Sequence, residues 1–305
     1  MVATLILAIT GGTGFVGQHL LDLATERGHT VRALTRRPQE ERHGVDWIEG
    51  HLEDRVVLEK LVQGSDAVIH VAGVINAPDA TGFEAGNVKG TLAMLAAATA
   101  AGARRFVHVS SLAAREPKLS QYGASKARSE ELVESSGLEW VIVRPPAVYG
   151  PGDKEMLELF RMAKAGLILL PPSGRLSVIH ADDLVRLLLN LAEREQPTKL
   201  IIEPHDNRPN GWTHKEFAEA LGHAVGRRAI ALPTPRPLLR MGAAFDRFVR
   251  GEKAKLTPDR AAYFSHPDWV VSSGKAPPPD LWSPQVLTEQ GLAETADWYR
   301  TKGWL

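Results

Sequence analysis

The chain has 305 residues, of which 44% are hydrophobic and 24% charged, so it can bury a large core in one or two domains. Lys plus Arg and Asp plus Glu both total 36, and this zero net charge argues against a general nucleic-acid-binding protein, which would carry a basic excess. Cysteine is absent, which excludes disulfides and thiolate chemistry, and the 11 histidines are scattered, so we expect no metal site. No apolar run reaches the roughly 18 residues that span a bilayer, so we expect a cytoplasmic protein.

Short apolar runs alternate with amphipathic segments along the first half of the chain. We expect strands at 4–9, 30–34, 45–49, 67–71, 105–109 and 140–143. We expect helices at 14–27, 54–62, 83–101 and 121–135. Strand–helix repetition with runs this apolar predicts an α/β fold, in which a doubly wound parallel sheet is covered by helices on both faces.

This alternation loosens beyond about residue 150. A helix at 181–195 and an apolar run at 199–202 are expected to return to the sheet, and Thr213 with Glu216 forms a capping-box pattern that predicts a helix from His214. The expected domains are a dinucleotide-binding domain over 1–150, with 181–203 returning to it, and a smaller substrate-binding lobe over 151–180 and 204–305.

The segment ITGGTGFVG joins the first expected strand to the first expected helix and contains Gly11, Gly14 and Gly17. Glycine lets the backbone approach a pyrophosphate, and the N-terminus of a helix supplies N–H donors and a positive dipole end. The alternative is a tight turn with no ligand. The surrounding strand, turn, helix and second strand favour a dinucleotide site.

The second expected strand is followed by Arg36 and Arg37. A carboxylate at this point would hold the ribose 2′-hydroxyl of NAD, whereas guanidinium groups suit the 2′-phosphate of NADP. The alternative is that both arginines are solvated surface charges. We therefore favour NADP(H) over NAD(H) as the cofactor.

A tyrosine and a lysine, Tyr122 and Lys126, are spaced to lie on one face of a helix. An ammonium beside a phenol favours the phenolate and lowers a pKa that starts near ~10, which makes Tyr122 a candidate general acid or base. Ser111 follows a strand, where its hydroxyl could hold a substrate carbonyl. Alone, this spacing is common on protein surfaces, but with the glycine turn upstream it indicates hydride-transfer chemistry.

These motifs together resemble an extended short-chain dehydrogenase/reductase of the NAD(P)-dependent epimerase/dehydratase family. TGGTGFVG matches the family pattern TGxxGxxG and YGASK matches YxxxK, with further matches in NVKGT, RPPAVYGPGD and VIHADDLV. The resemblance implies a Rossmann domain with a C-terminal substrate-binding lobe. It also implies catalysis by Tyr122 with Lys126 and Ser111, Lys126 gripping the nicotinamide ribose as well.

The same resemblance implies a set of cofactor contacts. Leu52 would lie by the adenine, Ala72 and Gly73 on the ribose side, and Pro145 and Val148 near the nicotinamide. The full implied set is Gly11, Thr13, Gly14, Phe15, Val16, Gly17, Arg36, Arg37, Leu52, Ala72, Gly73, Asn87, Tyr122, Lys126, Pro145 and Val148.

Departures from the family narrow the expected reaction. Leu112 and Ala113 follow Ser111 where sugar dehydratases carry an Asp–Glu pair, so dehydration lacks its carboxylates. The short loop before Tyr122, and Pro146 where many sugar-nucleotide epimerases have asparagine, weaken a nucleotide-sugar substrate. We expect an NADP(H)-dependent oxidoreductase that interconverts a secondary alcohol and a ketone. The alternatives are a nucleotide-sugar epimerase with retained NAD(P) and a non-catalytic NADP(H)-binding accessory subunit of a membrane complex.

One segment of the C-terminal half is unusually basic: the range 227–255 holds eight Lys or Arg and two Asp or Glu. Within it, 240–250 combines arginines with an apolar stripe, which predicts a pocket lid, a peripheral membrane contact or a partner site. The expected partner is a small-molecule substrate, and the sequence leaves open whether the protein forms a homodimer.

Overall fold

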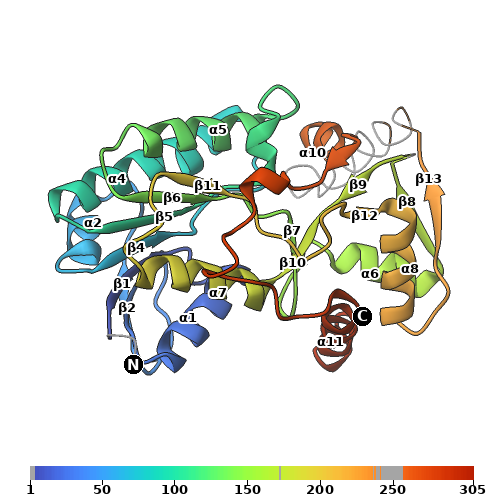
Figure 1. Ribbon diagram of the computed structural model, residues 1–305, viewed down its shortest axis with the longest axis horizontal. Coiled ribbons are helices and arrows are strands. Elements are labelled where there is room, and N and C mark those ends of the chain that lie inside the picture. The colour runs from blue at the N-terminus through green and yellow to red at the C-terminus, as the bar shows by residue number, and fades with distance from the viewer. Residues whose placement is uncertain (1–3, 172, 236, 238–240, 242–256) are drawn as a thin grey trace. The chain divides into compact units, whose positions relative to one another are not determined.

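The computed structural model describes residues 4–171, 173–235, 237, 241 and 257–305 (Figure 1). The basic segment Arg240–Arg250 lies, except for Met241, outside the described residues. Two compact units divide the chain. Unit 1 comprises Met1–Arg144, Leu184–Glu203 and Pro277–Trp282, and unit 2 comprises Pro145–Asp183, Pro204–Ala276 and Ser283–Leu305.

A seven-stranded sheet in the order β11-β6-β5-β4-β1-β2-β3 forms the centre of unit 1. Its strands are β1 (Ile6–Thr10), β2 (Thr30–Thr35), β3 (Val45–Glu49), β4 (Ala67–His70), β5 (Arg105–Val109), β6 (Trp140–Val143) and β11 (Leu200–Ile202). Every neighbouring pair is parallel. All residues of β4, β5 and β6 are buried, as expected of strands covered on both faces. The predicted doubly wound parallel sheet is therefore confirmed.

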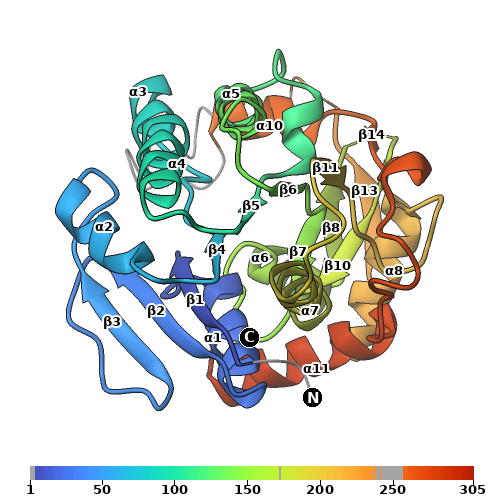
Figure 2. The ribbon, with the colours of Figure 1, turned by 60° about the vertical axis from the view of Figure 1, so that its left-hand side comes forward.

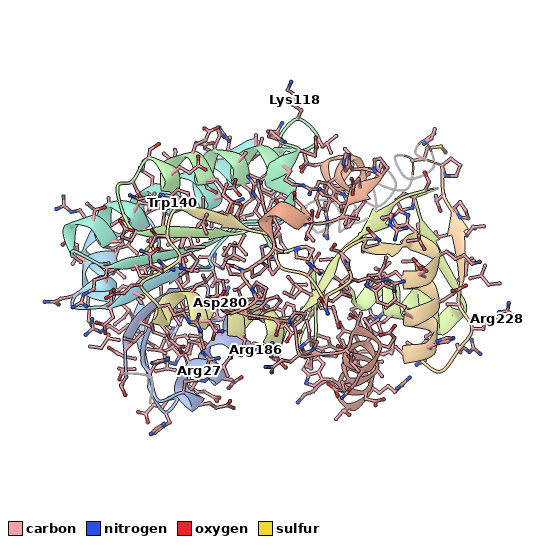
Figure 3. The ribbon with its side chains drawn as sticks, viewed as in Figure 1. Arg27, Lys118, Trp140, Arg186, Arg228 and Asp280 are labelled. Carbon is pink, nitrogen blue, oxygen red and sulfur yellow. The ribbon has the colours of Figure 1, made fainter. Side chains whose placement is uncertain are left out.

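Helices cover both faces of this sheet (Figures 1 and 2). One face carries α2 (Arg55–Val62), α4 (Gly90–Ala100) and α5 (Gln121–Glu134), and the other carries α1 (Phe15–Glu26) and α7 (Ala181–Glu193). Arg27, labelled in Figure 3, donates to Asn190 and Glu193 at the end of α7, at 2.9 Å each. The buried Arg105 guanidinium donates to the carbonyl of Leu191 in the last turn of α7, at 2.8 Å, and to that of Glu195 just beyond the helix, at 3.1 Å. These bonds attach α7 to the sheet and to α1.

The single helix predicted at 83–101 is instead three helical segments in series. They are α3 (Ala80–Phe83), a π-helical turn (Glu84–Lys89) and α4. The π-helical turn contains Asn87, whose side-chain amide bonds both the N–H and the carbonyl of Val74. This long-range pairing lies outside local helix periodicity, and π-helical turns occur frequently at functional sites.

Among its described residues, unit 2 has three small sheets and four α-helices. The strand pairs are β7 (Ala147–Tyr149) with β10 (Val178–His180) and β8 (Leu167–Leu170) with β13 (Ile230–Pro233), and β9 (Arg175–Leu176) lies between β12 (Trp212–Thr213) and β14 (Asp268–Trp269). The helices are α6 (Leu157–Ala165), α8 (His214–Ala224), α10 (Pro258–Phe264) and α11 (Thr288–Thr301). The predicted capping box at Thr213 and Glu216 is present at the start of α8. Among the described helices of the whole chain, none is long and apolar enough to cross a membrane.

Candidate active site

The glycine turn after β1 is shaped by contacts that only glycine permits. Gly11 has a φ of +77°, and a Cβ there would lie 2.7 Å from the backbone nitrogen of Ala72, which follows β4. A Cβ on Gly17 would lie only 2.0 Å from the carbonyl oxygen of Gly11. The Gly14 N–H donates to the same Gly11 oxygen at 3.0 Å. The turn therefore brings the start of α1 directly onto the end of β1.

The first turn of α1 is suited to bind an anion. Gly14 is its N-cap, no side chain caps the helix, and no acidic residue lies in its first turn. The backbone N–H groups of Phe15, Val16 and Gly17 are consequently left for a ligand, at the positive end of the helix dipole. Thr13 and Gly14 are exposed at this point. The cradle fits the pyrophosphate of a dinucleotide.

Arg36 and Arg37 follow β2, the neighbour of β1 in the sheet. Both are exposed, and among the described residues neither guanidinium has a carboxylate partner. The Thr35 hydroxyl donates to the Arg37 carbonyl at 2.7 Å and so holds the backbone of the turn. Because β1 and β2 are parallel, Arg36 and Arg37 begin at the same edge of the sheet as the glycine turn.

Residues after β4 meet the π-helical turn and α5. The Thr10 hydroxyl accepts the Ala72 N–H at 3.2 Å. A Cβ on Gly73 would lie 3.1 Å from Asn87 Oδ1 and 3.8 Å from Lys126 Nζ, so these three residues are neighbours. Asn87 also donates to the Ser125 hydroxyl at 2.9 Å. Leu52, which follows β3, lies against Gly90 at the start of α4: a Cβ on Gly90 would be 2.9 Å from Leu52 Cδ1.

Lys126 is a buried cation that the backbone holds in place. Only 4% of the residue is exposed, and Nζ donates to the Val109 carbonyl at the end of β5, at 2.9 Å. Burial lowers its pKa from 10.5 to about 8, and the Glu130 carboxylate opposes this shift. Burial and the Lys126 charge lower the pKa of His70 to about 3 and the pKa of His108 well below its ordinary value. Both histidines are therefore neutral around Lys126 at physiological pH.

Tyr122 and Ser111 are carried by two turns in close contact. Ser111 follows β5, and its hydroxyl accepts the Ala113 N–H at 3.2 Å as a 3₁₀ turn (Leu112–Arg115) begins. Gly123, next to Tyr122, lies so near that a Cβ would be 2.7 Å from the Ala113 carbonyl oxygen. The partly exposed Tyr122 ring has its centroid 6.1 Å from that of Phe83. The first turn of α5 thus packs onto the turn that holds Ser111.

The structure places most predicted site residues at the carboxyl ends of neighbouring parallel strands in unit 1. Pro145 and Val148 instead belong to unit 2, Val148 within β7, and their contact with a cofactor stays a prediction. Sequence reasoning missed Glu130, which is buried and lies one helical turn beyond Lys126. The i, i+4 spacing from Lys126 was a readable signal, but a helical glutamate is ordinarily exposed.

A family model described as NAD dependent epimerase/dehydratase family matches residues 7–202, well over half of the chain. The chain belongs to this family. It is an NAD(P)-dependent enzyme of the extended short-chain dehydrogenase/reductase type, as the sequence motifs predicted.

Two curated relatives of this epimerase/dehydratase family member are reductases by name. The ceramide reductase of Caulobacter vibrioides is 38% identical over 310 residues, covering 98% of this chain and 96% of the relative. The 2-alkyl-3-oxoalkanoate reductase of Stenotrophomonas maltophilia is 33% identical over 326 residues, covering 94% and 97%. These relatives support an NAD(P)-dependent reductase.

Solved structures show the same fold at low sequence identity. The UDP-N-acetylglucosamine 4-epimerase from Bacillus cereus aligns with a TM-score of 0.73 at 18% identity, covering 97% of both chains. The Bordetella bronchiseptica enzyme WbmH, in complex with NAD+, aligns with a TM-score of 0.75 at 19% identity, covering 99% of this chain and 100% of that one. At these identities the likeness concerns the fold alone.

Proposed function

We propose that this protein is an NADP(H)-dependent reductase that converts a ketone on a long-chain, largely apolar molecule into a secondary alcohol. The observation that carries the proposal is the buried Lys126 ammonium, held on the Val109 carbonyl and carried by the same helix face as Tyr122. Two relatives named for long-chain compounds, a ceramide reductase and a 2-alkyl-3-oxoalkanoate reductase, support the substrate class.

Three side chains act in the proposed reaction beside the cofactor: Tyr122, Ser111 and Lys126. The bound nicotinamide would supply the hydride to the carbonyl carbon. The Tyr122 hydroxyl donates its proton to the carbonyl oxygen, so the C=O bond becomes H–C–O–H, and the tyrosine regains a proton from water. The Ser111 hydroxyl orients that oxygen. The Lys126 ammonium, one helical turn from Tyr122, compensates the negative charge left on the tyrosine oxygen and would hold the ribose hydroxyls of the bound cofactor.

The NADP preference rests on Arg36 and Arg37 and has its own test. The double variant Arg36→Ala/Arg37→Ala is expected to weaken NADPH binding by on the order of a hundredfold, because it removes charge-assisted bonds to the 2′-phosphate. NADH binding should change less than threefold. Titration of nucleotide fluorescence measures both affinities. Arg55→Ala, which removes another exposed arginine, at the start of α2, is the control. An equal loss for both nucleotides would contradict the preference.

The reaction itself is tested with purified protein, NADPH and a panel of long-chain 3-oxo compounds. We expect NADPH oxidation together with a product that mass spectrometry shows to be heavier by two hydrogens. Interconversion of UDP-sugar epimers without net use of nucleotide would replace the proposal with an epimerase. Tight NADPH binding without turnover of any compound would favour an accessory, non-catalytic role.

A further inference from the structure

A cluster of buried charges adjoins Ser111 and Lys126 of the candidate active site, within unit 1. We call it the Glu130 cluster; it comprises Ser110, Arg115, Glu130, Arg144 and Glu203. These residues come from the ends of β5, β6 and β11, from the 3₁₀ turn and from the middle of α5. Glu130 is 4% exposed, Arg144 9% and Glu203 0%, so the charges are largely removed from solvent. None of them belongs to the glycine turn or to the proposed catalytic set.

Glu130 is the residue that connects this cluster to the site. Its Oε1 accepts the Ser110 hydroxyl at 2.5 Å and Arg144 Nε at 2.9 Å, and its Oε2 accepts a second nitrogen of Arg144 at 2.5 Å. Arg144 reaches on to Glu203 at 3.4 Å, and Arg115 contacts the other oxygen of Glu203 at 3.5 Å. A bidentate arginine–carboxylate pair holds both groups in a defined geometry.

Three consecutive residues, the last of which is the proposed catalytic serine, are each held by a different side chain or turn. The Val109 carbonyl accepts the Lys126 ammonium, the Ser110 hydroxyl donates to Glu130, and the Ser111 hydroxyl accepts the N–H of the following turn. Because Lys126 and Glu130 lie one turn apart on α5, one helix face holds two of these three positions. The bond to Glu130 is therefore made at the residue directly before Ser111.

The charged and titratable groups near Lys126 come from several elements. On α5 itself, Tyr122 precedes it by one turn and Glu130 follows it by one turn. From β4 and β5, His70 and His108 face it but are neutral, since the pKa of each is lowered mainly by burial. From the end of β6, Arg144 is paired to Glu130. Glu130 is thus the one negative charge among these groups, and it favours the cationic form of Lys126.

A purely structural explanation would treat the Glu130 cluster as an attachment between α5 and the strand ends. Such an attachment needs no particular charge next to Lys126, and buried ion pairs often add little net stability over apolar packing. A carboxylate in this place does something that an apolar residue could not do. It opposes the loss of the proton that burial would otherwise force on Lys126.

We propose that Glu130 is a positioning residue of this enzyme, which keeps Lys126 cationic and fixes the Ser110–Ser111 backbone through one carboxylate. The inference rests on the proposed function for the role of Lys126 and Ser111. It predicts two separable effects. The charge of Glu130 acts on the protonation of Lys126, and its bond to Ser110 acts on the placement of Ser111.

The experiment compares four proteins: wild type, Glu130→Gln, Ser110→Ala and the control Glu131→Gln. Glu131 is exposed, so its variant removes the same charge from the neighbouring position. NADPH affinity is measured from pH 6 to 9.5, and kcat and KM are measured over the same range. NADPH binding to the wild type should weaken as the pH rises and Lys126 loses its charge, with a midpoint near the Lys126 pKa of about 8.

Glu130→Gln is expected to move this midpoint to lower pH, and its affinity at pH 8.5 should fall roughly tenfold below wild type, the effect of one pKa unit. Ser110→Ala should keep the wild-type midpoint but lower kcat, because it removes the bond and leaves the charge. Glu131→Gln should behave as wild type. An unchanged midpoint in Glu130→Gln, or an equal shift in Glu131→Gln, would overturn the inference.

Two further arms keep the test decisive. If Glu130→Gln does not fold, Arg144→Gln is used instead. It removes the guanidinium partner of Glu130, so the Glu130 carboxylate should favour the cationic form of Lys126 more strongly and the midpoint of NADPH binding should move to higher pH. An unchanged midpoint would refute the role of Glu130. If wild type binds no nucleotide, the proposed function fails, and the pH dependence of apoprotein unfolding decides instead. Cationic Lys126 costs stability below its folded-state pKa, so in Glu130→Gln the relief with rising pH should begin at lower pH than in Glu131→Gln.

Discussion

Replacing Tyr122 with phenylalanine is expected to lower kcat by about three orders of magnitude, within the range of general acid catalysis. The ring that faces Phe83 remains, but the side chain no longer has a proton to give to the carbonyl oxygen. NADPH affinity should stay within about threefold, because Lys126, Asn87 and the glycine turn are unaltered. Turnover of the best substrate of the panel, with nucleotide titration on the same preparation, measures both quantities.

Tyr299→Phe is a matched control for this variant. The Tyr299 hydroxyl donates to the Asp153 carbonyl at 2.8 Å in the core of unit 2. Its loss should lower the free energy of unfolding by about 1 kcal/mol while kcat is retained. The two variants therefore separate catalysis from stability. Full activity in Tyr122→Phe would remove the proposed mechanism.

Gly17→Ala is expected to abolish nucleotide binding and to destabilise unit 1 by about 3 kcal/mol, the upper part of the usual range for overpacking. The added Cβ would lie 2.0 Å from the Gly11 carbonyl oxygen and 2.8 Å from Gly12 Cα. These are backbone atoms, so no side chain can turn away, and α1 must move off the end of β1. Urea denaturation gives the stability, and the thermal shift on adding NADPH reports binding.

Gly274→Ala supplies the comparison for the glycine variant. A Cβ at Gly274 meets no atom within 4 Å, so stability and NADPH binding should both stay close to wild type. A Gly17→Ala protein that folds with wild-type stability and still binds NADPH would show that the close approach of α1 to the turn is not required. The assignment of the cradle would then be wrong.

The strands predicted at 45–49, 105–109 and 140–143 have the bounds that the structure shows, because short runs of strand-forming residues define them locally. Complete burial is not what they share: β5 and β6 are buried throughout, whereas only Ile48 of β3 is buried. The pairs β7–β10 and β8–β13 were not predicted. Each strand has only three or four residues, and its partner lies some thirty to sixty residues away, a pairing that local periodicity does not encode.

The helix predicted at 83–101 shows the same limit in another form. Its sequence is helical throughout, and the structure agrees, except that Glu84–Lys89 winds as a π-helical turn. Within this turn, Asn87 bonds Val74 and Ser125 from other parts of the chain. The side-chain pattern within the helix contains no trace of these partners.

The sequence by itself determined the family, the parallel sheet, the glycine turn and the spacing of Tyr122 and Lys126. These features depend on residues that are near one another along the chain, where glycine geometry and the helical repeat act directly. Only the tertiary structure decided that Lys126 is buried on the Val109 carbonyl and that Glu130, Arg144 and Glu203 form one buried cluster beside it. The physical reason is that burial and charge pairing arise where separate strands end at one edge of a sheet, and both are set by distance in space.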